Sequence, residues 1–210
     1  MSRILIAGAT GLVGRHVLSQ AIADRRVDSI VAPTRRPLPP HPKILNPVSD
    51  MTVLPADADW WKVDGVVCSL GTTRANAGSA DAFRAIELDL QLAVARHART
   101  HGAERFALTS STGADPRSRF LYMRTKGEVE QAIAHLGWPS LTIVRPGAIL
   151  GHRDEVRKGE RFGIALLRVL GPIVPRSYRG NQARDIAAAL LEGALTGPPG
   201  THVVRARDIG

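Results

Sequence analysis

Three glycines spaced three residues apart, Gly8, Gly11 and Gly14, stand where an apolar run gives way to an amphipathic segment. In a strand-to-helix turn the first glycine permits a sharp bend, the second lets the backbone approach a pyrophosphate, and the third lets the helix pack against the sheet. Free N–H groups at the start of the helix would face the phosphates. The spacing differs from G-x-G-x-x-G, but the position is that of a dinucleotide-binding turn. The residues expected to bind the cofactor there are Gly8, Thr10, Gly11, Leu12, Val13 and Gly14.

Two arginines, Arg35 and Arg36, follow the second expected strand, and Arg35 lies 21 residues after Gly14. An acidic residue near this point would bind the ribose hydroxyls of NAD. None occurs between Asp28 and Asp50. A guanidinium can instead hold a 2′-phosphate through charge-assisted, bidentate hydrogen bonds. The pattern therefore favours NADP (NADPH) over NAD.

Further candidates stand at the ends of two later strands and in the helix that follows the second of them. Gly71, next to Leu70 and Thr72, would let the chain pass close to a cofactor. Ser110 and Ser111 end a strand, and Tyr122 and Lys126 follow at a spacing that puts both on one helix face. Together with the glycine turn, this set favours a catalytic site over an ordinary amphipathic surface. Cys68, by contrast, is interpreted as a small buried hydrophobe.

Strand and helix patterns alternate along the whole chain, which calls for a parallel sheet with right-handed crossovers. We expect one doubly wound α/β domain over residues 1–210, with about seven mainly parallel strands, helices on both faces and a small substrate-side segment around 150–182. The expected strands are Arg3–Ala7, Ser29–Thr34, Ile44–Leu45, Gly65–Leu70, Arg105–Ser110, Ser140–Arg145 and His202–Arg205. The expected helices are Gly11–Asp24, Ala80–His101, Arg119–Leu136, Glu160–Leu170 and Ala183–Leu195.

Composition excludes several classes of protein. The chain has 210 residues, 44% hydrophobic and 22% charged, which excludes collagen, coiled coil and a disordered chain. The net charge of +9 comes from scattered arginines, and aromatics make up only 4%, so a nucleic-acid partner is not expected. No stretch is long and apolar enough to span a bilayer. With one cysteine and no secretory run near the N-terminus, we expect a soluble cytoplasmic protein.

The sequence resembles the atypical short-chain dehydrogenases/reductases, NAD(P)-binding proteins with a Rossmann fold, and within them the Tat-interactive oxidoreductase subfamily. The resemblance runs through about three quarters of the chain. The segments that carry it are Gly8–Gly14, Arg35-Arg36, Leu70–Arg74, Ser110–Asp115, Phe120–Tyr122, Lys126–Glu130 and Arg145-Pro146-Gly147.

The resemblance implies roles for the hydroxyl and amine groups. Tyr122 would protonate a carbonyl oxygen as hydride reaches the carbon, and Lys126 would assist it by its positive charge and bind the nicotinamide ribose. Ser111 would hold the substrate carbonyl, with Ser110 as the alternative. Cofactor contacts are also implied for Pro146, Ala148 and Ile149, together with Leu70, Gly71 and Thr72.

One departure concerns the helix in which many members carry an asparagine that supports a proton-relay water. Here Glu87 occupies that region, so the relay cannot be assumed. A basic segment between Ile149 and Asp185 indicates either a shallow pocket for an anionic substrate or a solvated rim. His97 and His101 lack a third ligand, so no metal is expected.

The expected activity is NADPH-dependent reduction of a small carbonyl compound by a monomer or homodimer without membrane or nucleic-acid partners. The alternative is a non-catalytic, NADPH-binding regulator that acts through a protein partner.

Overall fold

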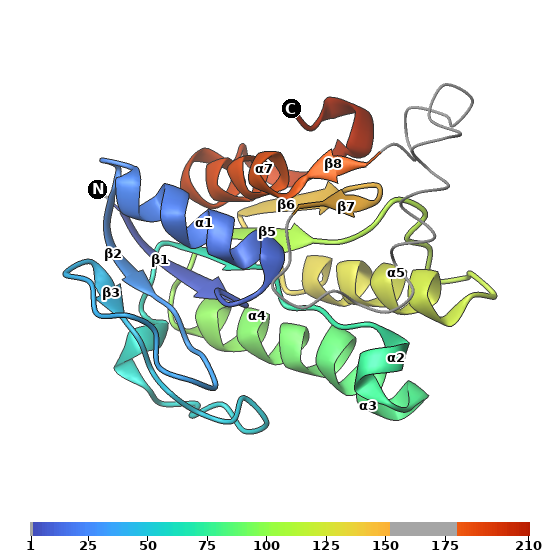
Figure 1. Ribbon diagram of the computed structural model, residues 1–210, viewed down its shortest axis with the longest axis horizontal. Coiled ribbons are helices and arrows are strands. Elements are labelled where there is room, and N and C mark those ends of the chain that lie inside the picture. The colour runs from blue at the N-terminus through green and yellow to red at the C-terminus, as the bar shows by residue number, and fades with distance from the viewer. Residues whose placement is uncertain (1, 152–179) are drawn as a thin grey trace.

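A parallel sheet of seven strands forms the centre of the computed structural model, which describes residues 2–151 and 180–210 (Figure 1). The strand order is β3-β2-β1-β4-β5-β6-β9, and every neighbouring pair is parallel. This is the doubly wound Rossmann-like arrangement expected from the sequence. The strands are β1 Ser2–Ala7, β2 Val27–Val31, β3 Ile44–Leu45, β4 Gly65–Cys68, β5 Arg105–Thr109, β6 Ser140–Arg145 and β9 Gly200–Arg205.

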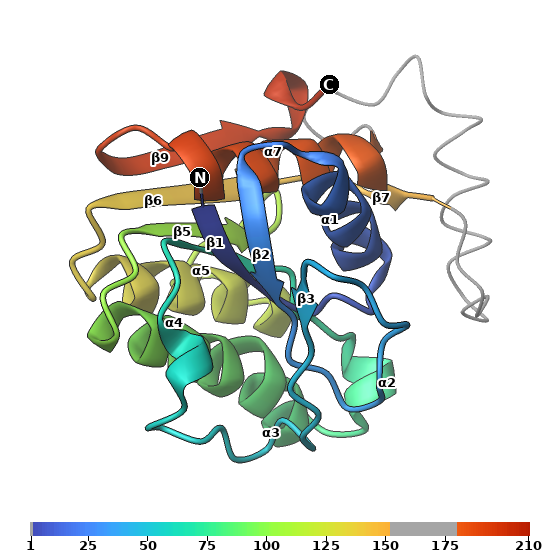
Figure 2. The same ribbon diagram turned by 90° about the vertical axis from the view of Figure 1, so that its left-hand side faces the viewer.

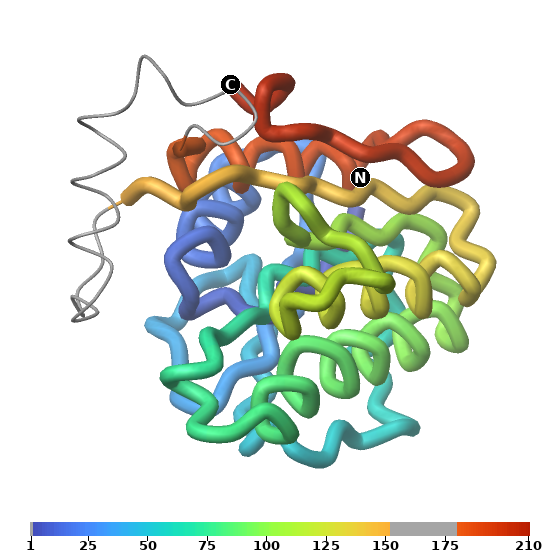
Figure 3. Tube along the Cα trace, turned by 90° about the vertical axis from the view of Figure 1, so that its right-hand side faces the viewer, coloured from blue at the N-terminus to red at the C-terminus, as the bar shows by residue number. Residues whose placement is uncertain are grey.

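Helices cover both faces of the sheet (Figure 2). The helices α1 (Leu12–Ala23) and α7 (Ala183–Thr196) pack on one face, and α4 (Gln91–Thr100) and α5 (Leu121–Ala134) on the other. Figure 3 shows α4 and α5 running side by side on their face. Because successive side chains of a strand point to opposite faces, the apolar run of β1 supplies both cores. Its residues Ile4 and Ile6 join the α1–α7 core, while Leu5 and Ala7 join the α4–α5 core.

The helix expected at Ala80–His101 forms as three consecutive pieces. They are α3 (Ala80–Arg84), a π-helical segment η2 (Ala85–Leu90), and α4. A short helix α2 (Arg74–Ala77) precedes them. The hydroxyls of Thr73 and Ser79 cap α2 and α3 by accepting from backbone N–H groups in their first turns. The expectation of one regular helix was therefore wrong at its centre, where the π turn alters the direction of the side chains.

The strand expected at Ser29–Thr34 is shifted toward the N-terminus and ends at Val31. Pro33 has no backbone N–H for a ladder hydrogen bond, and Thr34 keeps only an isolated bridge to Val48. The other expected elements that fall on described residues have boundaries within about two residues of the prediction. The helix expected at Glu160–Leu170 lies outside the described residues, as does most of the expected substrate-side segment.

A second, two-stranded parallel sheet, which the sequence did not indicate, joins β7 (Ile149–Leu150) to β8 (Asn181–Gln182). Asn181 is its anchor, because its side chain accepts from Gly147 N at 3.0 Å and donates to Ala206 O at 2.8 Å. The first bond ties the chain after β6 to the segment just before α7, and the second ties that segment to the chain after β9. Two 3₁₀ turns, η1 (Asp59–Trp61) and η4 (Ala206–Asp208), complete the described secondary structure.

Candidate functional site

The loops that follow β1, β4, β5 and β6 lie at one edge of the sheet, because parallel strands all end on the same side. Backbone hydrogen bonds join the first residues after β4 and β5 to the ends of the neighbouring strands β1 and β6. Ser69 N donates to Ala7 O at 2.9 Å, and Ser110 N donates to Val144 O at 2.8 Å. The predicted site residues from four separate segments are therefore brought to a common edge.

The glycine turn after β1 has no room for side chains at two of its three glycines. A Cβ on Gly14 would lie 2.0 Å from the carbonyl oxygen of Gly8, so α1 packs directly on the turn. Gly8 has a φ of +91°, and a Cβ there would lie 2.8 Å from the backbone nitrogen of Leu70. At Gly11 the added Cβ would meet Gly8 O at a less severe 3.3 Å.

The start of α1 fits a phosphate. Gly11 is its N-cap, no side chain caps it, and no acidic residue stands in its first turn. The first backbone N–H groups of a helix have no acceptor within it, so those of Leu12 and Val13 are available to a bound anion. The side chain of Val13 is buried in the core, which leaves only its backbone for such a contact, whereas Thr10 is exposed.

Arg35 and Arg36 are both exposed and lie in a loop that is held by Asn46. The side chain of Asn46 donates to Ala32 O at 2.6 Å and to Thr34 Oγ1 at 2.8 Å. It also accepts from Leu38 N at 2.8 Å. The loop is thereby closed on both sides of the arginines, which form no ion pair among the described residues. No spacing signal in the sequence connects Asn46 to this loop, so its role could not be predicted.

The loop after β4 rests on the buried carboxylate of Glu87, which belongs to the π-helical segment. Thr72 N donates to Glu87 Oε1 at 2.5 Å, and a Cβ on Gly71 would lie 3.2 Å from the same oxygen. The carbonyl of Leu70 accepts from Gln91 Nε2 at 3.1 Å. The absence of a side chain at Gly71 thus allows the loop to lie close against Glu87.

Lys126 is buried beneath this loop. Its Nζ lies 2.7 Å from Glu87 Oε2 and donates to Thr109 O at 3.3 Å. Burial by itself would lower the pKa of Lys126. The Glu87 carboxylate and the nearby Tyr122 outweigh that effect and hold the pKa above its usual value. Lys126 is therefore a charged ammonium at neutral pH.

Tyr122 stands one helical turn before Lys126 and is 40% exposed. Its ring packs against Phe83 of α3. The structure thus brings Tyr122 and Lys126 to one face of α5, as the spacing predicted.

Ser110 and Ser111 differ sharply in their surroundings. The hydroxyl of Ser110 is buried and donates to Glu130, and Arg145 binds the same carboxylate, with Nε 2.9 Å from Oε1. The hydroxyl of Ser111 is only partly buried and reaches Thr112 O at 3.3 Å. The hydroxyl of Ser110 is thus part of a buried hydrogen-bond network with Glu130 and Arg145, whereas the hydroxyl of Ser111 is more accessible.

The segment after β6 contains Pro146, Ala148 and Ile149. Thr112 N donates to Pro146 O at 2.8 Å, which joins this segment to the loop carrying Ser111. Asn181 N donates to Ala148 O at 2.8 Å, and Ile149 packs against the α1–α7 core. Asn181 is a second contributor that the sequence did not reveal.

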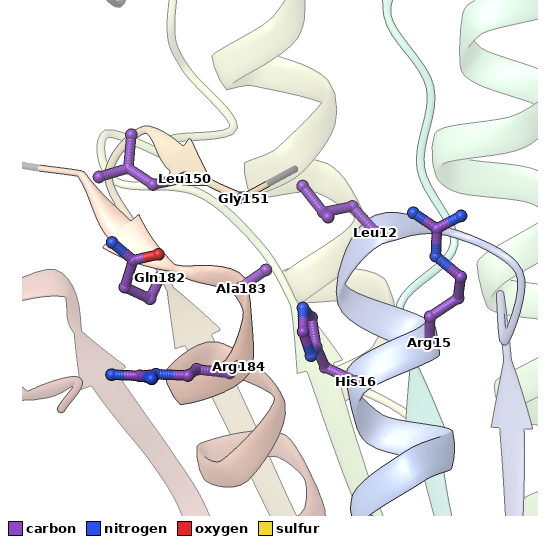
Figure 4. Close-up of a pocket in the computed structure, with 8 residues that line it drawn as sticks. All are labelled: Leu12, Arg15, His16, Leu150, Gly151, Gln182, Ala183 and Arg184. Atoms are coloured by element: carbon purple, nitrogen blue, oxygen red, sulfur yellow. The ribbon is translucent and has the colours of Figure 1, made fainter. Parts of the chain in front are cut away.

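A pocket of about 650 Å³ lies between α1 and the β7–β8 pair (Figure 4). Leu12 and His16 of α1 face Leu150 and Gln182 across it. Leu12 is the only predicted site residue that lines this pocket. The pocket lining therefore does not include Ser111, Tyr122 or Lys126. The basic residues expected at a substrate rim between 152 and 179 fall outside the described residues. Among the described residues, the pocket is lined by Leu12, Arg15, His16, Leu150, Gly151, Gln182, Ala183 and Arg184.

Cys68 is fully buried, and burial raises the pKa of its thiol to about 12. It is therefore unsuited to act as a nucleophile at neutral pH. Within residues 2–151 and 180–210, no cluster of histidine, cysteine and acidic side chains could hold a metal ion. In that same part of the chain, no helix is both long and apolar enough to cross a membrane.

The chain matches a known protein family and is similar in sequence to several named proteins. A family described as NAD(P)H-binding matches residues 8–163. "Protein fmp52, mitochondrial" of Emericella nidulans is 34% identical over 183 residues, which cover 82% of this chain and 78% of that protein. "Protein FMP52, mitochondrial" of Candida albicans is 39% identical over 160 residues, which cover 71% of this chain and 68% of that protein.

Solved structures share the fold at lower identity. "MoeE5 in complex with UDP-glucose and NAD" has a TM-score of 0.74 at 20% identity, covering 96% of this chain and 74% of that one. The UDP-N-acetylglucosamine 4-epimerase from Bacillus cereus has a TM-score of 0.72 at 17% identity, covering 100% of this chain and 80% of that one. At these identities the likenesses show that the chain shares the fold of these proteins.

The cytoplasmic location expected from the sequence is contradicted by these relatives, which are named mitochondrial proteins. The expectation rested on the lack of a secretory hydrophobic run. A mitochondrial targeting segment is amphipathic and arginine-rich instead, so that criterion could not detect one.

Proposed function

The chain belongs to the NAD(P)H-binding family, and from this premise we propose that it is an NADPH-dependent oxidoreductase that reduces a small carbonyl compound. The observation that carries the proposal is the placement of Tyr122 one turn from a buried, charged Lys126, at the sheet edge that also holds the glycine turn. That edge is where ligands bind in doubly wound sheets.

The first turn of α1 would hold the pyrophosphate. Its uncapped N–H groups and the close packing of Gly14 on Gly8 support this assignment. The segment Pro146–Ile149 and the loop Leu70–Thr72 would line the rest of the cofactor site. When bound, the reduced nicotinamide supplies the hydride for the reaction.

Arg35 and Arg36 would select the phosphorylated cofactor. Two exposed guanidinium groups in a loop closed by Asn46 support a phosphate contact, because a preformed loop loses little conformational freedom on binding. The preference for NADPH over NADH is thus a proposal about these side chains.

Tyr122 would donate its hydroxyl proton to the carbonyl oxygen as the carbonyl carbon accepts the hydride, so that the product is an alcohol. Lys126 lies one helical turn away, and its ammonium would bind the nicotinamide ribose. Ser111 would donate a hydrogen bond to the same oxygen, since its hydroxyl is the accessible one of the serine pair. Tyr122 is 40% exposed and can regain its proton from solvent.

The test is oxidation of NADPH by the purified chain against a panel of small aldehydes, ketones and quinones. We expect turnover with at least one member, and faster turnover with NADPH than with NADH. If both dinucleotides bind but no member of the panel is reduced, the reductase assignment fails. In that case a regulator that senses NADPH and acts through a protein partner becomes the better account.

A further inference from the structure

We propose that Glu87 is a positioning residue that locks Lys126 and the Leu70–Thr72 loop together as one unit at the cofactor edge. The inference deepens the proposed function and rests on it for the role of Lys126. It assigns to this carboxylate a task different from that of the asparagine expected from the resemblance.

Both oxygens of Glu87 bind protein groups. Oε1 accepts from Thr72 N at 2.5 Å. Oε2 lies 2.7 Å from Lys126 Nζ and accepts from Gln91 Nε2 at 3.1 Å. The side chains of Glu87 and Lys126 are only 1% and 5% exposed. One carboxylate therefore joins the loop after β4 to the helix α5.

All three partners of Glu87 are hydrogen-bond donors, namely a backbone amide, an ammonium and a side-chain amide. A carboxylate is the side chain that only accepts. An amide at this position would turn an N–H group toward at least one of these donors. The site thus suits a side chain with an acceptor at both terminal atoms, and an amide would leave a buried donor unsatisfied.

The π-helical segment places the carboxylate where it can make these bonds. Glu87 lies within Ala85–Leu90, and Gln91 follows as the first residue of α4. An extra residue in the turn redirects the side chains relative to a regular helix, and such π turns are frequent at functional sites. The loop meets Glu87 closely because residue 71 is glycine.

Both oxygens of Glu87 accept from protein donors, and one of those donors is the ammonium of Lys126. The effect of Glu87 on chemistry is exerted through Lys126. The charged or titratable groups that bear on Lys126 are Glu87 from the π segment, Tyr122 from its own helix and Cys68 from β4. With Glu87 neutralised, burial would lower the pKa of Lys126 and promote loss of its proton.

The experiment is fluorescence titration of NADPH and NADH into the full chain and into Glu87→Gln, at pH values from about 7 to about 9.5, a range below the usual lysine pKa. For the wild type we expect dissociation constants that are constant with pH. For Glu87→Gln we expect both cofactors to bind about tenfold more weakly at the alkaline end than at neutral pH. The ratio of NADPH to NADH affinity should stay unchanged, since Arg35 and Arg36 are untouched.

Two further variants sharpen the result. Glu128→Gln makes the same chemical change on α5, at a partly exposed ion pair with Arg84, and should behave as the wild type. Glu87→Asp keeps the charge but shortens the reach to Thr72 N, so it should weaken binding by several-fold at every pH with no alkaline loss. If Glu87→Gln does not fold, the affinity of Glu87→Asp for the two cofactors tests the proposal.

A flat profile for a folded Glu87→Gln with wild-type affinity would overturn the proposal, and so would unchanged binding by Glu87→Asp. Neither readout needs a carbonyl substrate. A failure to find turnover would therefore overturn the proposed function while leaving the link between Glu87, Lys126 and the cofactor intact.

Discussion

The ring of Tyr122 lies against the ring of Phe83, with centroids 6.1 Å apart and planes tilted by 41°. Phe83 is 1% exposed and anchored in the core, so it fixes a tyrosine that is itself 40% exposed. Within the described parts of the chain the hydroxyl of Tyr122 has no hydrogen-bond partner. The ring is thus held by an aromatic contact while the hydroxyl remains available to a substrate.

Replacing Tyr122 by phenylalanine should separate these two roles. The ring contact with Phe83 is retained, so the free energy of unfolding should change by less than about 0.5 kcal/mol. Loss of the proton donor should reduce kcat by about 10²- to 10⁴-fold, the usual contribution of general acid catalysis. Initial rates with the best carbonyl substrate and urea unfolding measure the two quantities. Full turnover by Tyr122→Phe would show that another group supplies the proton.

Arg35→Ala should reduce the affinity for NADPH by about ten- to hundredfold, the range expected for loss of charge-assisted hydrogen bonds to a phosphate. Affinity for NADH should stay within about twofold, because that cofactor lacks the phosphate. Fluorescence titration at fixed ionic strength measures both. Arg207→Ala removes an exposed arginine in η4 that pairs only weakly with Asp208, and serves as the control for net charge. An equal loss for both cofactors would contradict a phosphate-binding role.

Asn46 provides a separate test of the same loop. Asn46→Asp keeps an acceptor for Leu38 N but loses the donors to Ala32 O and Thr34 Oγ1. We expect a loss of about 1–3 kcal/mol in the free energy of unfolding, as for buried groups left without partners. The NADPH-to-NADH affinity ratio should also fall, because the arginine loop is no longer closed. Unchanged discrimination in a destabilised variant would mean that Asn46 serves only the fold.

The sequence predicted a parallel sheet of about seven strands and the segments that follow those strands, because both depend on local patterns. Apolar periodicity places a strand such as β1, and a strand followed by glycines places the start of α1. The same reasoning brought Tyr122 and Lys126 to one helix face. These features depend on residues close together in the chain.

The partners of Glu87, Ser110 and Asn46 could not be predicted in this way. Glu87 reaches Lys126 across 39 positions in the sequence, from a π-helical turn that apolar periodicity does not reveal. The hydroxyl of Ser110 donates a hydrogen bond to Glu130 of the following helix instead of facing the candidate site. Apolar periodicity does not predict this contact. Such contacts form when helices and loops pack together. They therefore cannot be predicted from the spacing of the residues in the sequence.

Alanine substitutions at Gly11 and Gly14 should have different effects: Gly14→Ala should lower stability, and Gly11→Ala should weaken cofactor binding. In a helix interior alanine is favoured over glycine by about 1 kcal/mol. At Gly14 that gain is opposed by a Cβ placed 2.0 Å from the carbonyl oxygen of Gly8, which is backbone and cannot rotate away. Forced overpacking of this kind costs about 1–3 kcal/mol or more, so Gly14→Ala should be less stable than the wild type in urea unfolding.

Gly11→Ala should instead fold with a loss of no more than about 1 kcal/mol, as for an unfavourable N-cap residue. Gly11 has an extended backbone with a φ of −74°, and the added Cβ would lie 3.3 Å from Gly8 O. Its methyl group would occupy the space through which a pyrophosphate approaches the first turn of α1. Titration should then show NADPH and NADH binding weakened alike, by about tenfold or more. Wild-type affinity in Gly11→Ala would mean that the cofactor does not approach the turn at this residue, and a fully stable Gly14→Ala would contradict the close packing of α1 on Gly8.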